Sequence, residues 1–371
     1  MTNILKSFEF DWVDAFTNKP FGGNGCAVVH GGAELSVDTC LSYVRETSLV
    51  ECTFTGPSDV ADIKVRYFLA SREIPFAGHP TIATVSAMRS RGLIGDGPLV
   101  LETLAGLIPV TVDGSNIQMT QVAPEFGPKV PAEVVAAVGG LTAEDIIGEP
   151  QVVSTGLPFC IVVLKSVGAL KRASLNLDAL GRYNVHLGQT GNNIMEPFWV
   201  VQEGATPDGD TFSRLLLAPP SPLEDPFTGS ATGAMAAYLW ANGLIAAPIF
   251  VAEQGHGMGR AGQAQVKVLG PHDGITGVEV SGESFVLMSG TVQLPIQQKK
   301  GRETSAFFSF SGTAVYSAAI RPMLSSFNKT WCAHVSTSTF NVSTLSSGFS
   351  GTSYGSEMPV NSLILPSRAS L

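Results

Sequence analysis

The chain has 371 residues, of which 44% are apolar and 14% are charged, so it is long enough for two domains with buried cores. Its net charge of −9 and pI near 5.2 argue against a nucleic-acid partner, because nucleic-acid binders need basic stripes. No run approaches 18 apolar residues, and residues 1–10 hold no signal-peptide core, so we expect no membrane contact.

The spacing of the cysteines and histidines indicates the compartment of the protein and limits the metal sites it can have. The five cysteines are scattered without paired spacing, which indicates a reducing compartment and a cytoplasmic protein. Neither a zinc pattern nor a Walker loop nor a dinucleotide fingerprint occurs, so we expect no metal and no cofactor.

Residues 1–123 predict a first lobe of short strands and two helices. Strands are expected over residues 8–16, 26–29, 51–55, 63–69, 99–103, 107–112 and 117–121. A helix over 36–47 has Ser36 as its cap. A helix over 81–91 is surrounded by small residues, which predicts burial inside a wrapped sheet.

Residues 124–297 predict a second lobe, whose last strand is free to return to the first. The Pro-rich stretch 123–131 is expected to be a linker. Helices are expected over 132–138, 143–147 and 230–241, and strands over 152–165, 198–202, 213–218, 266–269, 278–281, 285–289 and 291–294. Residues 298–371 contain 17 Ser and no clear period, so we expect a poorly ordered tail rather than a third domain.

One phrase occurs twice in the chain, at residues 73–81 (EIPFAGHPT) and again, altered, at 224–232 (EDPFTGSAT). Over the 22 positions that begin with these phrases, nine are identical, whereas chance gives about one or two. Two copies are too few for a solenoid, so the repeat predicts two related lobes with a site between them.

Each copy predicts a strand, a tight turn at glycine and a helix starting at Thr81 or Thr232. A helix start has unpaired N–H groups and partial positive charge, so two facing starts would hold a carboxylate or a developing enolate. The alternative is an ordinary strand–turn–helix corner that was duplicated. His79, Asp225 and Ser230 favour function, because a plain corner has little need of them.

Glu51 is the leading candidate for acid/base chemistry. It enters an apolar strand, where desolvation raises the pKa of a carboxyl group into the range of a proton shuttle; the alternative is an edge-strand Glu that reaches water. His79 and Asp225 occupy corresponding corners and converge if the lobes face each other. A Ser230–His79–Asp225 triad is disfavoured because no nucleophile elbow surrounds the serine. Asn24, in a glycine-rich turn, is interpreted as structural.

These residues resemble the PhzF family of phenazine-biosynthesis-type isomerases. The resemblance covers residues 8–296 and rests on the stretches 13–24, 51, 73–81, 224–231 and 254–260. It implies the diaminopimelate-epimerase-like α+β fold, with two pseudo-symmetric lobes, each a curved, mostly antiparallel sheet wrapped around a central helix. It also implies a cofactor-independent isomerase, commonly a homodimer, acting on trans-2,3-dihydro-3-hydroxyanthranilate or a similar small acid.

Carried over residue by residue, the resemblance implies that Glu51 is the acid/base. It implies that five positions bind substrate, namely Gly78 and His79 in the first lobe and Asp225, Gly229 and Ser230 in the second. Amino-acid epimerases of this fold instead use two cysteines, at positions that are Ala77 and Thr228 here, so a two-thiol racemase is not expected.

The chain departs from the family pattern at Val50, at residues 69–71 and over residues 214–223. These departures leave the substrate open. Besides the isomerase, two alternatives remain: another proton-transfer, epimerisation or cyclisation enzyme of secondary metabolism, or a binding protein without activity.

Overall fold

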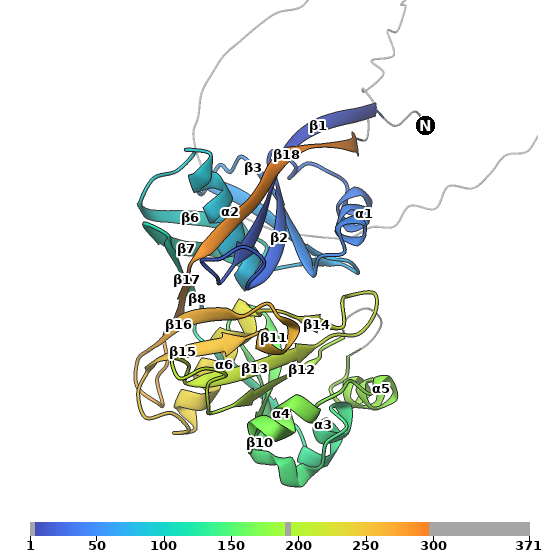
Figure 1. The fold of residues 1–371 in the computed structure, drawn as a ribbon, viewed down its shortest axis with the longest axis vertical. Helices are drawn as coiled ribbons and strands as arrows, with labels where there is room; N and C mark the ends of the chain where they lie inside the picture. The colour runs from blue at the N-terminus through green and yellow to red at the C-terminus, as the bar shows by residue number, and fades with distance from the viewer. Residues whose placement is uncertain (1–3, 190–193, 297–371) are drawn as a thin grey trace, which may run out of the picture. The chain divides into compact units, whose positions relative to one another are not determined.

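The described sheets divide into two lobes that repeat one strand pattern. The computed structural model describes residues 4–189 and 194–296 (Figure 1). The strands of the first lobe are β1 (Ile4–Ala15), β2 (Asn24–Val29), β3 (Glu51–Gly56), β4 (Ile63–Leu69), β5 (Glu73–Ile74), β6 (Gly97–Thr103), β7 (Gly106–Asp113), β8 (Asn116–Gln121) and β18 (Ser284–Ile296). Those of the second lobe are β9 (Glu125–Lys129), β10 (Ile146–Ser154), β11 (Pro158–Leu164), β12 (Pro197–Val201), β13 (Thr211–Leu216), β14 (Glu224–Asp225), β15 (Ile249–Gln254), β16 (Gly262–Leu269) and β17 (Gly277–Gly282).

The pairing of these strands follows the same order in both lobes. The parallel pairs β2–β3 and β4–β6 of the first lobe correspond to β11–β12 and β13–β15 of the second, and the other pairs are antiparallel. Strand β8 pairs with β17 and joins the lobes into one sheet. Strand β18 returns to pair along the whole of β1, and β9 takes the corresponding place beside β10. The predicted α+β fold with two pseudo-symmetric lobes is confirmed.

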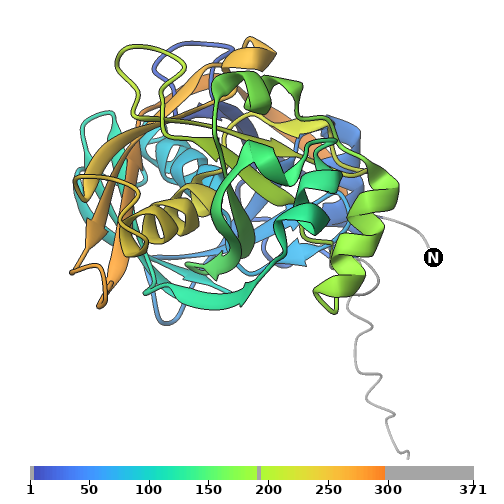
Figure 2. The same cartoon turned by 90° about the horizontal axis from the view of Figure 1, so that it is seen from below.

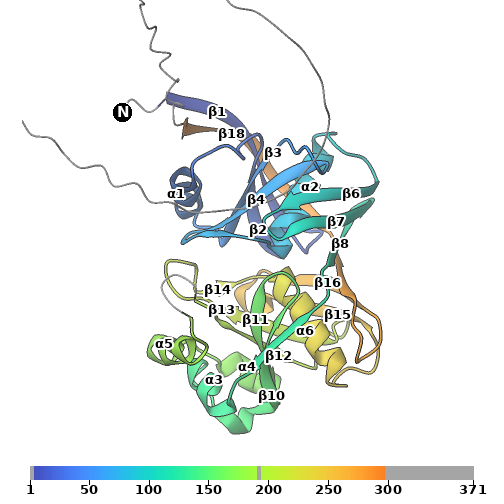
Figure 3. The same cartoon turned by 180° about the vertical axis from the view of Figure 1, so that it is seen from behind.

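The helices occupy two kinds of position. They are α1 (Val37–Thr47), α2 (Gly78–Ser90), α3 (Ala132–Val138), α4 (Val167–Arg172), α5 (Leu177–His186) and α6 (Gly229–Ala241), with short 3-10 turns η1 (Ala143–Asp145) and η2 (His256–Met258). Helices α2 and α6 are buried nearly all round, and strands enclose them (Figure 2). Helix α1 packs on the outer face of the first sheet and α3, α4 and α5 on that of the second (Figure 3). Within the described ranges, no helix is long and apolar enough to cross a membrane.

Two predictions about local structure are wrong, and three elements were missed. The stretch 123–131 contains an edge strand, β9, which tolerates Pro128 because every one of its residues is exposed. The two strands expected over 285–294 are one strand, in which Gly290 pairs with Phe10 instead of forming a turn. Strand β15 and helices α4 and α5 were not predicted. The boundary near residue 123 stays a prediction, and the predicted tail lies outside the described residues.

Both central helices begin earlier than the Thr81 and Thr232 starts that the repeated phrase predicted, each by three residues. Helix α2 begins at Gly78 and α6 at Gly229. The hydroxyl groups of Thr81 and Thr232 do not cap these helices, because they donate to the carbonyl groups of Ala77 (2.7 Å) and Thr228 (2.9 Å), four residues earlier. Each helix therefore presents glycine in its first turn.

The starts of α2 and α6 lie in direct contact. A Cβ atom on Gly78 would be 2.5 Å from Ser230 N and 2.6 Å from Gly229 Cα, and one on Gly229 would be 3.2 Å from Gly78 Cα. The residue that precedes each helix, Ala77 or Thr228, makes no side-chain cap to the first N–H groups of that helix. Only glycine allows this approach, which places two uncapped, partially positive helix ends together.

We expect Gly78→Ala to lower the free energy of unfolding by about 2 kcal/mol or more, because the added Cβ meets backbone atoms that cannot rotate away. The matched control is Gly181→Ala in α5, where an added Cβ has nothing within 4 Å. That control should leave stability unchanged or raise it by up to ~1 kcal/mol. Denaturant midpoints measure both, and equal midpoints for the two variants would contradict the close approach.

Candidate active site

The two repeated corners are held by the same arrangement in both lobes. Arg66 of β4 binds the carboxylate of Glu73 through two nitrogen atoms, at 2.7 and 2.8 Å. Arg214 of β13 binds Glu224 in the same way, at 2.9 and 2.7 Å. In each case the remaining guanidinium nitrogen donates to two backbone carbonyl groups. The glutamate that opens each phrase thus fixes its turn to the sheet.

A cavity of about 300 Å³ lies where these corners meet. It brings together all six predicted site residues, which are Glu51, Gly78, His79, Asp225, Gly229 and Ser230. Further polar lining comes from Arg72, Glu73 and Glu196, and much of the wall is apolar, including Leu157, Phe159, Met195, Leu215 and Leu217. A small, largely apolar cavity with a few converging polar groups is typical of a site for a small molecule.

Glu51 is the first residue of β3 and is 9% exposed. Alternation along the strand turns the next side chain, Cys52, into the outer core with Phe54 and Phe68. Burial raises the pKa of the Glu51 carboxyl group well above its ordinary value. The charge of Asp225 raises it further, and that of Arg72 opposes the shift.

Asn24, the first residue of β2, connects the polar groups of the two lobes. Its Nδ2 lies 2.9 Å from His79 Nδ1 and donates to Asp225 Oδ1 (2.5 Å) and to the carbonyl of Phe227 (2.8 Å). The Nδ1 atom of His79 also lies 3.6 Å from Glu51 Oε2. Glu51, His79 and Asp225 therefore form one buried cluster, with the Asn24 amide between the histidine and the aspartate.

Burial sets the charge states of the other two members of the cluster. Desolvation raises the pKa of Asp225 to about 7. Hydrogen bonds from Thr228 and Asn24 lower this pKa, but their effect is smaller than that of desolvation. Desolvation and the charge of Arg260 lower the pKa of His79 to about 3, so its imidazole is neutral at pH 7. Because His79 Nδ1 faces an amide nitrogen, which can only donate, we assign the ring proton to Nε2, which has no hydrogen-bond partner among the described residues.

This arrangement suits proton transfer and does not suit a nucleophilic triad. A triad needs the histidine between the serine and the carboxylate. Here His79 Nδ1 contacts an amide, and Asp225 is bound by Asn24 and by the Thr228 hydroxyl (2.6 Å). A buried carboxyl group with a raised pKa, beside a neutral donor, is the pairing that general acid/base catalysis needs.

Two positions that hold the cluster together were missed in the sequence. Asn24 was interpreted as structural, and Gln254 was noted only as part of a matching stretch. Gln254, at the end of β15, accepts from Thr228 N (3.0 Å) and donates to the Asp225 carbonyl (2.7 Å). Neither contact has a local signal, because the partners lie far away along the chain.

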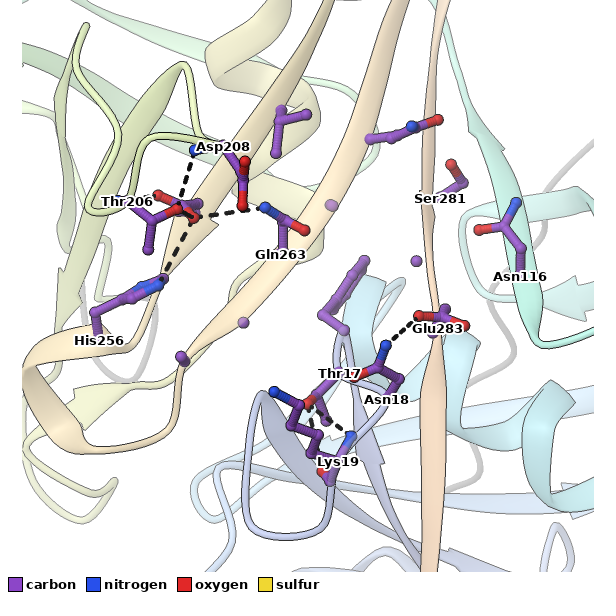
Figure 4. Close-up of a pocket in the computed structure, with 18 residues that line it drawn as sticks. Thr17, Asn18, Lys19, Asn116, Thr206, Asp208, His256, Gln263, Ser281 and Glu283 are labelled. Carbon is purple, nitrogen blue, oxygen red and sulfur yellow. Dashed lines mark hydrogen bonds and ion pairs between the residues drawn. The ribbon is translucent and has the colours of Figure 1, made fainter.

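A larger cavity of about 560 Å³ lies elsewhere in the described part of the chain (Figure 4). Its polar groups already pair with one another: Glu253 accepts from Thr206 N (2.9 Å) and Thr206 Oγ1 (2.6 Å), and Asn18 Nδ2 donates to Glu283 (2.8 Å). None of the six predicted site residues lines it. Among the residues that the structure describes, no three His, Cys, Asp or Glu side chains form a group that could hold a metal ion.

The fold and the polar cluster match one known family. Residues 13–290 match the family model described as phenazine biosynthesis-like protein (PhzC-PhzF), so the chain belongs to this family. It is an isomerase of the PhzF type. The predicted family, fold and class of enzyme are thereby confirmed, while the roles of the six site residues stay predictions.

The relatives are similar over nearly their whole length. The uncharacterized isomerase YfhB of Bacillus subtilis is 31% identical over 296 residues, which cover 76% of this chain and 99% of the relative. The trans-2,3-dihydro-3-hydroxyanthranilate isomerase of Pseudomonas aeruginosa is 29% identical over 290 residues, 76% of this chain and 98% of the relative. The structure of the PhzF-family phenazine biosynthesis protein of Bacillus anthracis has a TM-score of 0.67 and 26% identity, covering 77% of this chain and 99% of that chain.

The raised pKa of Asp225 predicts how Asp225→Asn changes stability with pH. Between about pH 4 and 7 the folded protein keeps a proton on Asp225 that the unfolded chain has released, so the wild type loses stability as the pH rises through this window. A shift from 3.8 to about 7 corresponds to at most roughly 4 kcal/mol. Asn cannot ionise, so it does not share this loss. The free energy of unfolding of Asp225→Asn, measured relative to that of the wild type, should therefore be higher at pH 7.5 than at pH 4.5. Denaturation at both pH values measures this difference, and a constant difference would contradict the raised pKa.

Proposed function

We propose that this isomerase moves a proton between two carbon atoms of a small cyclic or unsaturated acid, with Glu51 as the base and then the acid. The observation that carries the proposal is the buried Glu51 carboxyl group, 3.6 Å from a neutral His79 and beside Asp225. The P. aeruginosa relative is named for trans-2,3-dihydro-3-hydroxyanthranilate, and we propose this compound as the first substrate to test.

The substrate carboxylate would bind at the joined starts of α2 and α6. Support comes from the absence of a side-chain cap on either helix, which leaves first-turn N–H groups, including those of Gly78 and Gly229, for a ligand. Two like partial charges in contact are stabilised by an anion between them. The Ser230 hydroxyl group adds a further donor at the second helix start.

The reaction needs only one acid/base group. Ionised Glu51 takes the proton from one ring carbon, and the electron pair that remains is delocalised over the neighbouring unsaturated bonds. The protonated Glu51 then returns the proton to a second carbon on the same face, so no proton is gained or lost. The raised pKa makes Glu51 a stronger base at neutral pH, and the Nε2–H of His79 is a donor for the negative charge that develops.

A second candidate is a different proton-transfer reaction, such as epimerisation or cyclisation, on another small acid. The observation that favours it is that the departures from the family pattern border the cavity, since Val50, Leu69, Leu215 and Leu217 all line it. A panel of small acids assayed for solvent-deuterium uptake discriminates the two candidates. Binding of one of these acids without any turnover or exchange would instead favour a protein without activity.

We also propose that the protein acts as a cytoplasmic homodimer. The four cysteines in the described ranges are free and buried, as expected in a reducing compartment, and the family resemblance implies a dimer. Sedimentation equilibrium should give twice the 38.9 kDa mass of the chain. A concentration-independent monomer would contradict the dimer and leave the proposed chemistry unaffected.

We expect Glu51→Gln to fold and to lose turnover of trans-2,3-dihydro-3-hydroxyanthranilate by roughly 10²–10⁴-fold or more, because the amide cannot carry the proton. The matched control is Glu253→Gln, another buried carboxyl group, which lines the larger cavity and is bound by Thr206. That control should keep its turnover. The absorbance change of the substrate measures both variants, and activity retained by Glu51→Gln would refute the assignment.

A further inference from the structure

Arg260 reaches from the second lobe to the turn of the first lobe that precedes Asn24. It follows η2, and its Nη2 donates to Asp14 Oδ1 (2.7 Å) and to the carbonyl of Gly22 (2.9 Å), while its Nε donates to the carbonyl of Gly23 (3.0 Å). Asp14 lies on β1 and its side chain is fully buried. One guanidinium group thus binds a buried carboxylate and two successive carbonyl groups of the other lobe.

The turn that Arg260 binds has little freedom of its own. Asp14 Oδ2 accepts from Phe21 N (2.8 Å), and the carbonyl of Ala261 accepts from Gly23 N (3.0 Å). Gly23 has a φ of +48°, and a Cβ there would lie 2.0 Å from the carbonyl oxygen of Ala15. The turn is therefore fixed by contacts from both lobes, and the residue that follows it is Asn24.

Asn24 is the point at which this turn meets the acid/base cluster. Its single amide nitrogen lies within 2.9 Å of an imidazole nitrogen, a carboxylate and a backbone carbonyl group. An amide nitrogen has two hydrogen atoms for these three acceptors, so its position decides how they are shared. A small displacement of the turn would change that sharing and move His79 and Asp225 relative to each other.

We propose that Arg260 is a positioning residue for the acid/base cluster, holding the 22–23 turn from the second lobe so that Asn24 bridges His79 and Asp225. The inference rests on the proposed function, because it concerns the same site. Arg260 does not line the cavity and acts through Asn24. Its charge also contributes to keeping His79 neutral, by lowering the pKa of the imidazole.

The kinetic test compares Arg260→Gln with Arg91→Gln. Arg91, at the end of α2, binds Asp11 of β1 through Nε (2.5 Å) and Nη2 (3.1 Å), and Asp11 is fully buried. Both substitutions therefore leave a buried β1 aspartate without its arginine, but the contacts of Arg91 lie within the first lobe. We expect kcat of Arg260→Gln to fall by about 10-fold or more with KM little changed, while Arg91→Gln loses stability and keeps its kcat. Arg260→Lys keeps the charge but not the forked contacts, so it should recover only part of the loss.

A second readout does not depend on turnover. In the full chain without substrate, nitrogen NMR of His79 should show a neutral ring protonated on Nε2 from pH 5 to 8. Glu51 from β3 and Asn24 from β2 contact this ring, Asp225 from β14 is bound to the same Asn24 amide, and Arg260 from the segment after η2 acts on the ring through its charge. Arg260→Gln should shift the Nδ1 signal and raise the pKa of His79, while Arg91→Gln should leave both unchanged.

The two readouts separate failure of the inference from failure of the proposed function. Wild-type kcat together with an unchanged His79 signal in Arg260→Gln would overturn the positioning role. If the wild type turns over none of the small acids, the proposed function fails, and the NMR comparison still decides whether Arg260 positions the cluster. If Arg260→Gln does not fold, Arg260→Lys is compared with Arg91→Lys by the same two measurements, and equal effects of the two lysines would overturn the inference.

Discussion

The contact between the starts of α2 and α6 is the constraint on which the site depends. Two helix ends with the same partial charge meet at Gly78 and Gly229, and neither is capped by a side chain. Such a contact is electrostatically unfavourable on its own and becomes favourable when an anion binds. The Arg66–Glu73 and Arg214–Glu224 pairs hold both corners to their sheets, so the recess between the lobes has a fixed shape.

Around this recess, burial gives three titratable groups different tasks. The pKa of Glu51 is raised, that of Asp225 is raised to about 7, and that of His79 is lowered to about 3. The same physical cause, desolvation, favours the protonated acid and the neutral base, because each is the uncharged form. The cluster therefore holds a Glu51 carboxyl group that binds a proton more tightly than an exposed one and an imidazole that donates without carrying charge.

The repeated phrase was sufficient to predict two lobes and the convergence of His79 and Asp225, because a duplicated corner implies a duplicated fold. Glu51 lies outside the phrase, and its place in the site was implied by the family resemblance. The helix starts were misplaced because Thr81 and Thr232 were expected to cap, whereas their hydroxyl groups bond backwards to Ala77 and Thr228. The bridging role of Asn24 was not predictable, because its partners His79 and Asp225 lie 55 and 201 residues away. Long-range contacts of this kind leave no local pattern.

The central claim is that Glu51 breaks one C–H bond of a small acid and remakes another. The most direct measurement uses trans-2,3-dihydro-3-hydroxyanthranilate labelled with deuterium at the ring carbon that loses its proton, with mass spectrometry of the product. The account predicts that the wild type removes the label from that carbon and that Glu51→Gln leaves it in place. Product formed with the label still on its original carbon would contradict the account.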